Sequence, residues 1–307
     1  MEEFLTPDEQ WPKNKLVGDS METYLAAPYK QSSTVKHAVK SVRDYHFFKK
    51  AKSKETESQS FGTMVHTSIL TPELFDGKYV VFNPEDRPNP DQTFAAKVNK
   101  EWKDRQFALA EARGQTVVDK ERQEDFETLM DAFFASPYAN LLDPTNNSHP
   151  LVEQSIYTTL MGLEVKVRID HLTQYINEDG EVTGYLITEL KTIDDAHAEA
   201  FNRDIFKYGW DVQAFMQISA LSAIIPNGLT VEFRWLTLQT SPPFGIQEYA
   251  PSTGLLDLAR LKFTSAAQTI LDYEANRIPV PCGYYANTFV IDVPAYEKKR
   301  MENSNPF

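Results

Sequence analysis

The sequence predicts an α/β fold of the α+β kind, with a central mixed β-sheet flanked by helices and a helical N-terminal half. Segments rich in Val, Ile, Thr and Tyr are concentrated between residues 151 and 193, whereas apolar residues recur near helical spacing before residue 150. A long helical pattern then separates this group from another β-like run at 229–238. Strands joined by a short turn and then by helices favour a mixed sheet.

The first 150 residues are expected to be mostly helical. Residues 1–20 are expected to be irregular, "SKETESQS" (53–60) to be a loop and "FNPEDRPNPDQT" (82–93) to be a surface loop. Helices are expected at 33–54 with Ser33 or Thr34 as the N-cap, at 61–71 before Pro72, at 94–112 and at 119–135.

The second half carries the predicted sheet. Strands are expected at 151–160, 163–176, 183–193, 229–238 and 245–249, and helices at 196–225 and 255–276. The turn "NEDG" at Asn177–Gly180 predicts a hairpin between the second and third strands. The polar end of the chain is expected to be frayed.

Charge and cysteine content restrict the function. The formal net charge of −13 argues against a polyanionic partner, but between Lys30 and Lys54 eight basic residues accompany one acidic residue, Asp44. This segment fits either a local grip on phosphate or a solvated helix face. The single cysteine, Cys282, cannot form an internal disulfide or hold zinc alone. We find neither a signal sequence nor a membrane-spanning run, and expect a soluble, cytoplasmic protein.

Side-chain alternation brings candidate catalytic residues together. In "LEVKVRIDHL" the apolar residues at odd positions share one face, and Glu164, Lys166, Arg168 and Asp170 share the other. Glu189 and Lys191 likewise share a face of the next strand, so the predicted hairpin lets Asp170 and Glu189 converge. Two adjacent carboxylates favour a bound Mg²⁺, and a lysine beside them can orient water or stabilise phosphate charge. An ordinary cross-strand ion pair is the alternative.

Four short motifs occur in a specific order along the chain. They are "FGTMVHTSIL" before the sheet, "KVRIDHL" and "ELKT" on neighbouring strands, and "IFKYGWDVQAFM" on the following helix. From about residue 32 to 238 the sequence resembles the PD-(D/E)xK nuclease superfamily, in particular exodeoxyribonuclease VIII (RecE) and its phage relatives. The resemblance implies a restriction-endonuclease-like core, and a division into an N-terminal arm (1–30), one exonuclease domain (31–280, with its helical part at 31–150, sheet core at 151–240 and last strand and helix at 241–280) and a tail (281–307).

The resemblance also implies roles for individual residues. Asp170 and Glu189 match the metal-binding acids, the main-chain carbonyl of Leu190 is a further ligand, and Lys191 matches the catalytic lysine. His66 matches an active-site histidine near the metal, with a buried core histidine as the alternative. Glu153 resembles an acid that binds metal directly or through water, with a surface glutamate as the alternative.

The helix after the third strand matches the family with one departure. Gln213 matches a glutamine that holds the active site and the DNA, but Gln217 stands where many relatives have a tyrosine. Tyr208 is an unsuitable substitute, because on a continuous helix it lies about 500° from Gln213. The basic N-terminal helix implies DNA contacts from Ser33, Lys36, Lys40 and Arg43.

The function implied is a Mg²⁺-dependent exodeoxyribonuclease, with Mn²⁺ as a substitute, that digests linear double-stranded DNA from 5′ to 3′. Its 3′ overhangs would serve recombination with a single-strand annealing protein of the RecT type, and relatives form homo-oligomeric rings around DNA. A phage or prophage gene would place the protein in the host bacterial cytoplasm. The alternatives are a RecB-like or restriction-type endonuclease, or a catalytically silent DNA-binding protein. A third, a metabolic Mg²⁺ enzyme acting on nucleotides, lacks a glycine-rich phosphate loop.

Overall fold

The structure is a computed structural model, and it describes residues 11–49, 57–75, 77–142 and 151–279 and positions 293 and 298. The predicted frayed tail, Cys282 and the cations at 50, 52 and 54 lie outside the described residues, apart from positions 293 and 298 of the tail. Within this part of the chain, every helix is too short or too polar to cross a lipid bilayer.

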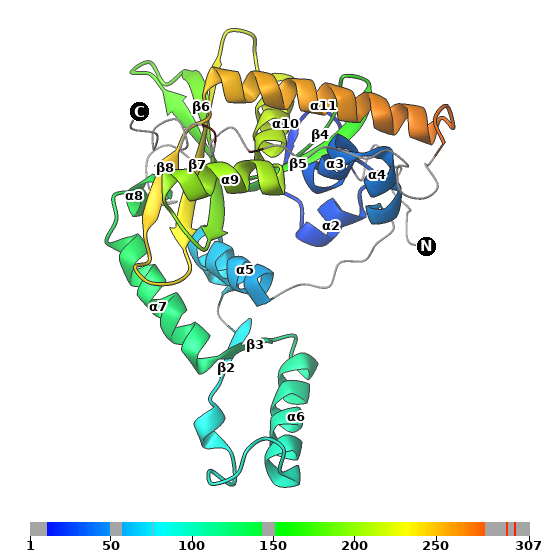
Figure 1. The fold of residues 1–307 in the computed structure, drawn as a ribbon. Coiled ribbons are helices and arrows are strands. Elements are labelled where there is room, and N and C mark those ends of the chain that lie inside the picture. Colours follow the sequence, from blue (N-terminus) through cyan, green and yellow to red (C-terminus); the bar gives the residue numbers. More distant parts are fainter. Residues whose placement is uncertain are drawn as a thin grey trace, which may run out of the picture.

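A mixed sheet forms the centre of the molecule (Figure 1). In the described part of the chain its six strands lie in the order β1-β4-β5-β6-β7-β8, and only the β6–β7 pair is parallel. The strands are β1 (Leu16–Val17), β4 (Leu151–Leu160), β5 (Leu163–Ile176), β6 (Val182–Ile193), β7 (Thr230–Gln239) and β8 (Ile246–Tyr249). This confirms the predicted fold class and each strand predicted in the second half.

Helices cover both faces of the sheet (Figure 1). One face packs against α3 (Ser32–Lys40), α4 (Val42–Phe48), α9 (Ala198–Tyr208), α10 (Trp210–Ser222) and α11 (Thr253–Glu274). The other face packs against α5 (Glu57–Leu70), α7 (Lys120–Phe134) and α8 (Tyr138–Leu142). Strand β7 shows the alternation that makes this two-sided core: Phe233 and Trp235 enter the first layer, and Leu236 and Leu238 enter the second.

Two predicted helices are each divided in two. The segment expected to be one helix from residue 33 breaks at Ser41, whose extended backbone ends α3 and whose hydroxyl accepts the Asp44 N–H at the start of α4. Gln31, rather than Ser33 or Thr34, is the N-cap of α3. The segment expected at 196–225 breaks at Gly209, which adopts the left-handed conformation with φ of 74°.

The N-terminal segment is more ordered than the sequence predicts. Its strand β1 pairs with β4, and Ser20 caps the short helix α2 (Met21–Ala26). The prediction that residues 1–20 are irregular is therefore wrong at residues 16–17, which form β1, and at Ser20, which caps α2. A two-residue strand carries too little periodicity to be recognised from sequence.

A small extension projects from the body between α5 and α7 (Figure 1). It contains the η1 turn (Pro72–Leu74), β2 (Tyr79–Phe82), the η2 turn (Pro84–Asp86), α6 (Lys97–Ala112) and β3 (Thr116–Asp119), with β2 and β3 paired in parallel. The sequence predicts its helix and most of its loop but misses both strands. Helix α5 also begins at Glu57, within the segment expected to be a loop.

Candidate active site

The candidate site lies where strands β5 and β6 separate. From the hairpin turn the two strands pair as far as His171 and Thr188. Beyond that point β6 pairs with β7, whereas β5 pairs with β4 and, at Val165, with Lys30. Asp170 and Glu189 occupy the first position of this fork on either strand. The structure therefore brings together the two carboxylates that the hairpin was predicted to bring together, and the splitting strands open space between them.

Glu189 is almost completely buried and receives three N–H donors. Its Oε1 accepts from Lys191 Nζ at 2.7 Å and from Gln213 Nε2 at 2.5 Å, and its Oε2 accepts from Gln217 Nε2 at 2.8 Å. Gln217 Nε2 also donates to the carbonyl of Arg168 at 2.9 Å, so this side chain bridges the two separating strands. Gln217 thus supports the site without the phenol found in many relatives.

Asp170 turns toward β6, away from the face shared by the polar residues before it. Its Oδ2 accepts the Leu190 N–H at 2.9 Å. Ile169 and Leu172 both pack into the same core although they are three residues apart, so the predicted alternation along β5 stops at this point. On the neighbouring strand Glu153 has φ of 53°, a left-handed conformation that a non-glycine residue adopts only when its surroundings enforce it.

Helix α5 brings His66 to the fork because it packs closely on β6. A Cβ added to Gly62 would lie 2.9 Å from Thr192 Oγ1, so any larger residue here would force α5 or the Thr192 side chain to shift. His66 follows one turn later on the same side of the helix, with Nδ1 3.7 Å from Asp170 Oδ2. Burial, and secondly the Lys191 ammonium, lowers the pKa of His66 to about 4, so its imidazole is neutral at pH 7 and keeps a lone pair for a ligand.

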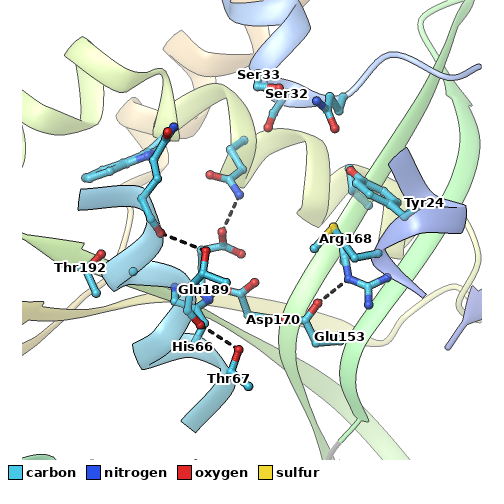
Figure 2. Close-up of a pocket in the computed structure, with 18 of the residues that line it drawn as sticks. Tyr24, Ser32, Ser33, His66, Thr67, Glu153, Arg168, Asp170, Glu189 and Thr192 are labelled. Carbon is cyan, nitrogen blue, oxygen red and sulfur yellow. Dashed lines mark hydrogen bonds and ion pairs between the residues drawn. The ribbon is translucent and has the colours of Figure 1, made fainter. Parts of the chain in front are cut away.

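The donor set fits a divalent cation. Ligand atoms of His66, Glu153 and Asp170 lie within 4.8 Å of one another, and Figure 2 shows these side chains and Glu189 gathered at the fork. Burial and the neighbouring Glu189 carboxylate raise the pKa of the Asp170 carboxyl well above its ordinary value. With Asp19 and Arg168 beside Glu153 included, and with all four carboxylates ionised, the two cations leave two negative charges uncompensated. One divalent cation would balance them.

Comparison with known proteins agrees with this geometry. Residues 32–287 match the profile of a family described as "PDDEXK-like domain of unknown function (DUF3799)". The chain belongs to this PDDEXK-like family. The predicted membership of the PD-(D/E)xK superfamily is thereby confirmed, and the more specific resemblance to exodeoxyribonuclease VIII stays a prediction.

A solved structure shares the fold of this chain. It is a "Putative exonuclease" from Eubacterium rectale, with a TM-score of 0.54 over 95% of this chain and 100% of that one, at 12% sequence identity. At this identity the likeness concerns the fold alone. No curated protein matches the sequence.

The PDDEXK-like site opens into a cavity of about 1250 Å³. Only some of the residues predicted to bind DNA line this cavity. Ser33 and Lys36 line it, whereas Lys40 and Arg43 do not belong to its lining. Burial, then the charge of Lys40, lowers the pKa of Lys36. Tyr208, which the sequence analysis set aside, also lines the cavity, because the break at Gly209 separates its helix from that of Gln213.

Sequence reasoning assigned no role in the PDDEXK-like site to Arg168, Asp19 or Trp210. Arg168 contacts Glu153, and Lys191 Nζ lies 5.4 Å from the centre of the Trp210 ring. Arg168 does lie in the motif "KVRIDHL", but its charge alone does not distinguish it from Lys166 two residues earlier. Asp19 carries no signal in the sequence, since its partners lie more than 130 residues away.

Proposed function

We propose that this protein is a divalent-metal-dependent exodeoxyribonuclease that digests linear double-stranded DNA from 5′ to 3′ and leaves 3′ single-stranded overhangs. The observation that carries the proposal is the meeting of Asp170, Glu189 and Lys191 at the strand fork. A carboxylate pair with a lysine next to it in a cleft is suited to phosphodiester hydrolysis, in which negative charge grows on the phosphate.

The proposed metal ligands are Asp170, Glu189, the main-chain carbonyl of Leu190, His66 and Glu153, for Mg²⁺ with Mn²⁺ as a substitute. When bound, such a cation polarises a phosphate oxygen and lowers the pKa of water. Glu189 has a position to offer, because a carboxylate has about four acceptor sites and three N–H donors reach it here.

Lys191 is proposed as the catalytic cation. Its ammonium is held by Glu189 at 2.7 Å and lies over the Trp210 ring, and both contacts restrict where it points. From there it orients a water molecule toward the phosphate and stabilises charge on the phosphate oxygens. Gln213 Nε2 donates to the same Oε1 at 2.5 Å, and Gln217 Nε2 donates to Oε2 at 2.8 Å, so both oxygens of the carboxylate are held in place.

DNA is proposed to enter along α3. Ser33 and Lys36 line the cavity and are the nearest proposed phosphate contacts, and Lys40 and Arg43 continue away from it on α3 and α4. The cavity exceeds the roughly 300–1,000 Å³ common for small-molecule sites, which supports a polymeric substrate. A homo-oligomeric ring would concentrate these cations around the DNA, and an annealing protein of the RecT type would receive the overhang.

The test compares a linear duplex, labelled at one 5′ end, with a closed circle of the same sequence. We expect mononucleotides from the linear duplex only, early release of the 5′ label, and loss of activity with EDTA. Lys191→Ala should lower the rate about 10²–10³-fold, the cost of removing one charge-stabilising group. Lys97→Ala, at an exposed lysine on α6 that does not line the cavity, is the matched control.

Each other outcome selects an alternative. Cutting of the circle would support a RecB-like or restriction-type endonuclease, and early release of label from a 3′ end would reverse the polarity. Absence of Mg²⁺-dependent cutting, with DNA binding retained, would support a silent DNA-binding protein. Light scattering of the purified chain checks the ring, which a monomer would rule out.

A further inference from the structure

The N-terminal strap, which we define as residues 11–29, crosses the active-site end of β4 and β5. Residues 11–29 lie outside the segment that matches the family profile. The strap is attached to the body independently of the site: β1 pairs with β4, and the Asn14 N–H donates to the Tyr157 carbonyl at 2.8 Å. Lys166 donates to the carbonyls of Tyr24 and Ala27 at 2.6 and 2.8 Å, at the end of α2.

One strap residue, Asp19, points its carboxylate at the sheet. The side chain is 9% exposed, and it accepts hydrogen bonds from Ser155 Oγ at 2.6 Å and from the Tyr157 hydroxyl. Its Oδ1 also lies 2.9 Å from Arg168 Nη1, and its main-chain carbonyl accepts from Nη1 and Nη2 of the same guanidinium at 3.0 Å. Asp19 therefore holds one edge of Arg168 with both its side chain and its backbone.

The Nε edge of the Arg168 guanidinium faces the active site. Its Nε donates to Oε2 of Glu153, the residue with the left-handed backbone and one of the three clustered ligand candidates (Figure 2). The Arg168 side chain is 11% exposed and the ring of Tyr24 lies 5.8 Å from it, so the guanidinium has little freedom. A chain of contacts thus runs from Asp19 through Arg168 to Glu153.

We propose that Asp19 is a positioning residue for the metal site: acting through Arg168, it fixes the Glu153 carboxylate so that its second oxygen faces His66 and Asp170. This inference rests on the metal site of the proposed function. Asp19 also offsets the charge of Arg168. Without Asp19, the guanidinium would bind both oxygens of Glu153 and would repel a cation at the fork.

The experiment measures Mn²⁺ binding to the full-length, DNA-free protein by calorimetry, with titration to millimolar Mn²⁺. Asp19→Asn keeps the size of the side chain and removes its charge, and we expect about 10-fold weaker Mn²⁺ binding, the lower end of the loss typical for residues that orient a metal ligand. Asn14→Ala, which weakens the attachment of the strap, and Asp257→Asn, an exposed acid on α11, should leave Mn²⁺ affinity unchanged.

A double-mutant cycle separates this role from a structural one. In a Glu153→Gln background, Asp19→Asn should cause no further loss of Mn²⁺ affinity, because the group it positions is gone. An equal loss in both backgrounds would indicate a general effect of charge or strap stability and would overturn the proposal, as would unchanged affinity in the single variant. If Asp19→Asn does not fold, Arg168→Gln takes its place in the same cycle, since Ser155 and Tyr157 still hold Asp19.

The outcome for the wild-type protein keeps the two proposals apart. If wild type binds Mn²⁺ and the cycle shows no coupling, the positioning role fails and the proposed nuclease stands. If wild type binds no Mn²⁺, the metal site of the proposed function fails and the role of Asp19 falls with it. Coupling without nuclease activity would retain the positioning role on a metal site of another function.

Discussion

The strand fork and the extension differ in how completely the hydrogen-bonding groups of their buried side-chain amides are paired. In the extension, Asn99 is fully buried and each of its polar atoms has a partner: its Oδ1 accepts the Asn89 N–H, and its Nδ2 donates to the carbonyls of Asn89, Gln92 and Thr93. At the fork, Gln217 Oε1 and His171 Nε2 are buried without a hydrogen-bond partner, and the Asp170 carboxyl has a raised pKa.

This difference indicates that the fork, unlike the extension, contains groups that lower the stability of the folded protein. The extension closes on itself around the Phe82 ring, which lies 5.4 Å from those of Trp102 and Phe107, so its contacts agree with one another. The fork keeps two carboxylates side by side at an energetic cost, which is typical of functional sites. Removal of a carboxylate at the fork should therefore lower activity but raise stability, whereas substitutions in the extension should affect stability alone.

The largest effect is expected from Asp170→Asn. Nuclease activity should fall by about 10³-fold or more, since a proposed metal ligand is lost. The metal-free variant should nevertheless gain about 1 kcal/mol of unfolding free energy at pH 7. The amide of the substituted side chain is uncharged without taking up a proton, and its oxygen still accepts the Leu190 N–H. Thermal unfolding with and without EDTA measures this, and a destabilised variant would contradict the comparison.

The Asp170 carboxyl should also make the stability of the folded protein depend on pH. Its folded pKa is raised, so between about pH 3.9, the ordinary value, and that raised value the folded state binds more protons than the unfolded state. The metal-free wild-type protein should accordingly lose stability as pH rises through this window. In Asp170→Asn this loss should be absent, and urea unfolding at several pH values provides the measurement.

Gln217→Leu should have an intermediate effect. It removes the donor shared by Glu189 and the Arg168 carbonyl, leaving a buried carboxylate with one fewer hydrogen bond, at a cost of about 1–3 kcal/mol of stability. Activity should fall about 10-fold or more as the fork widens. Single-turnover digestion and urea unfolding test the two parts, and full activity with normal stability would show that the bridge is dispensable.

Gly62→Ala should have a smaller effect, which a second substitution should reverse. The added methyl group would meet Thr192 Oγ1 and push α5, and with it His66, away from β6. A several-fold loss of kcat is expected at unchanged helix content. Thr192→Ala in the same chain removes the contact and should restore most of the rate; failure of this rescue would place the role of Gly62 elsewhere.

Asn99→Ala should have the smallest effect on activity. The Asn89 N–H loses its acceptor, and the carbonyls of Asn89, Gln92 and Thr93 each lose one of two donors, which should cost about 1–3 kcal/mol locally. Hydrogen exchange should speed up in β2, β3 and α6 and stay unchanged at β5 and β6. Digestion of a short duplex should proceed at the wild-type rate, and a large loss of activity would assign the extension a role in handling DNA.

The sequence by itself determined the fold class, the hairpin and the meeting of Asp170 with Glu189. These follow from local signals: the alternation in β5 and β6, the turn at Asn177–Gly180 and the order of the motifs. The same signals predicted that α5 carries His66, because helical spacing and Pro72 are both local.

Only the tertiary structure decided what surrounds these residues. The contacts of Gln217 with Arg168, of Arg168 with Glu153 and of Arg168 with Asp19 join residues 15 to 149 positions apart, and no local pattern encodes them. The breaks at Ser41 and Gly209 were also missed, since the apolar spacing continues across them. Such features depend on which groups packing leaves without a partner, and that is settled only when the chain is folded.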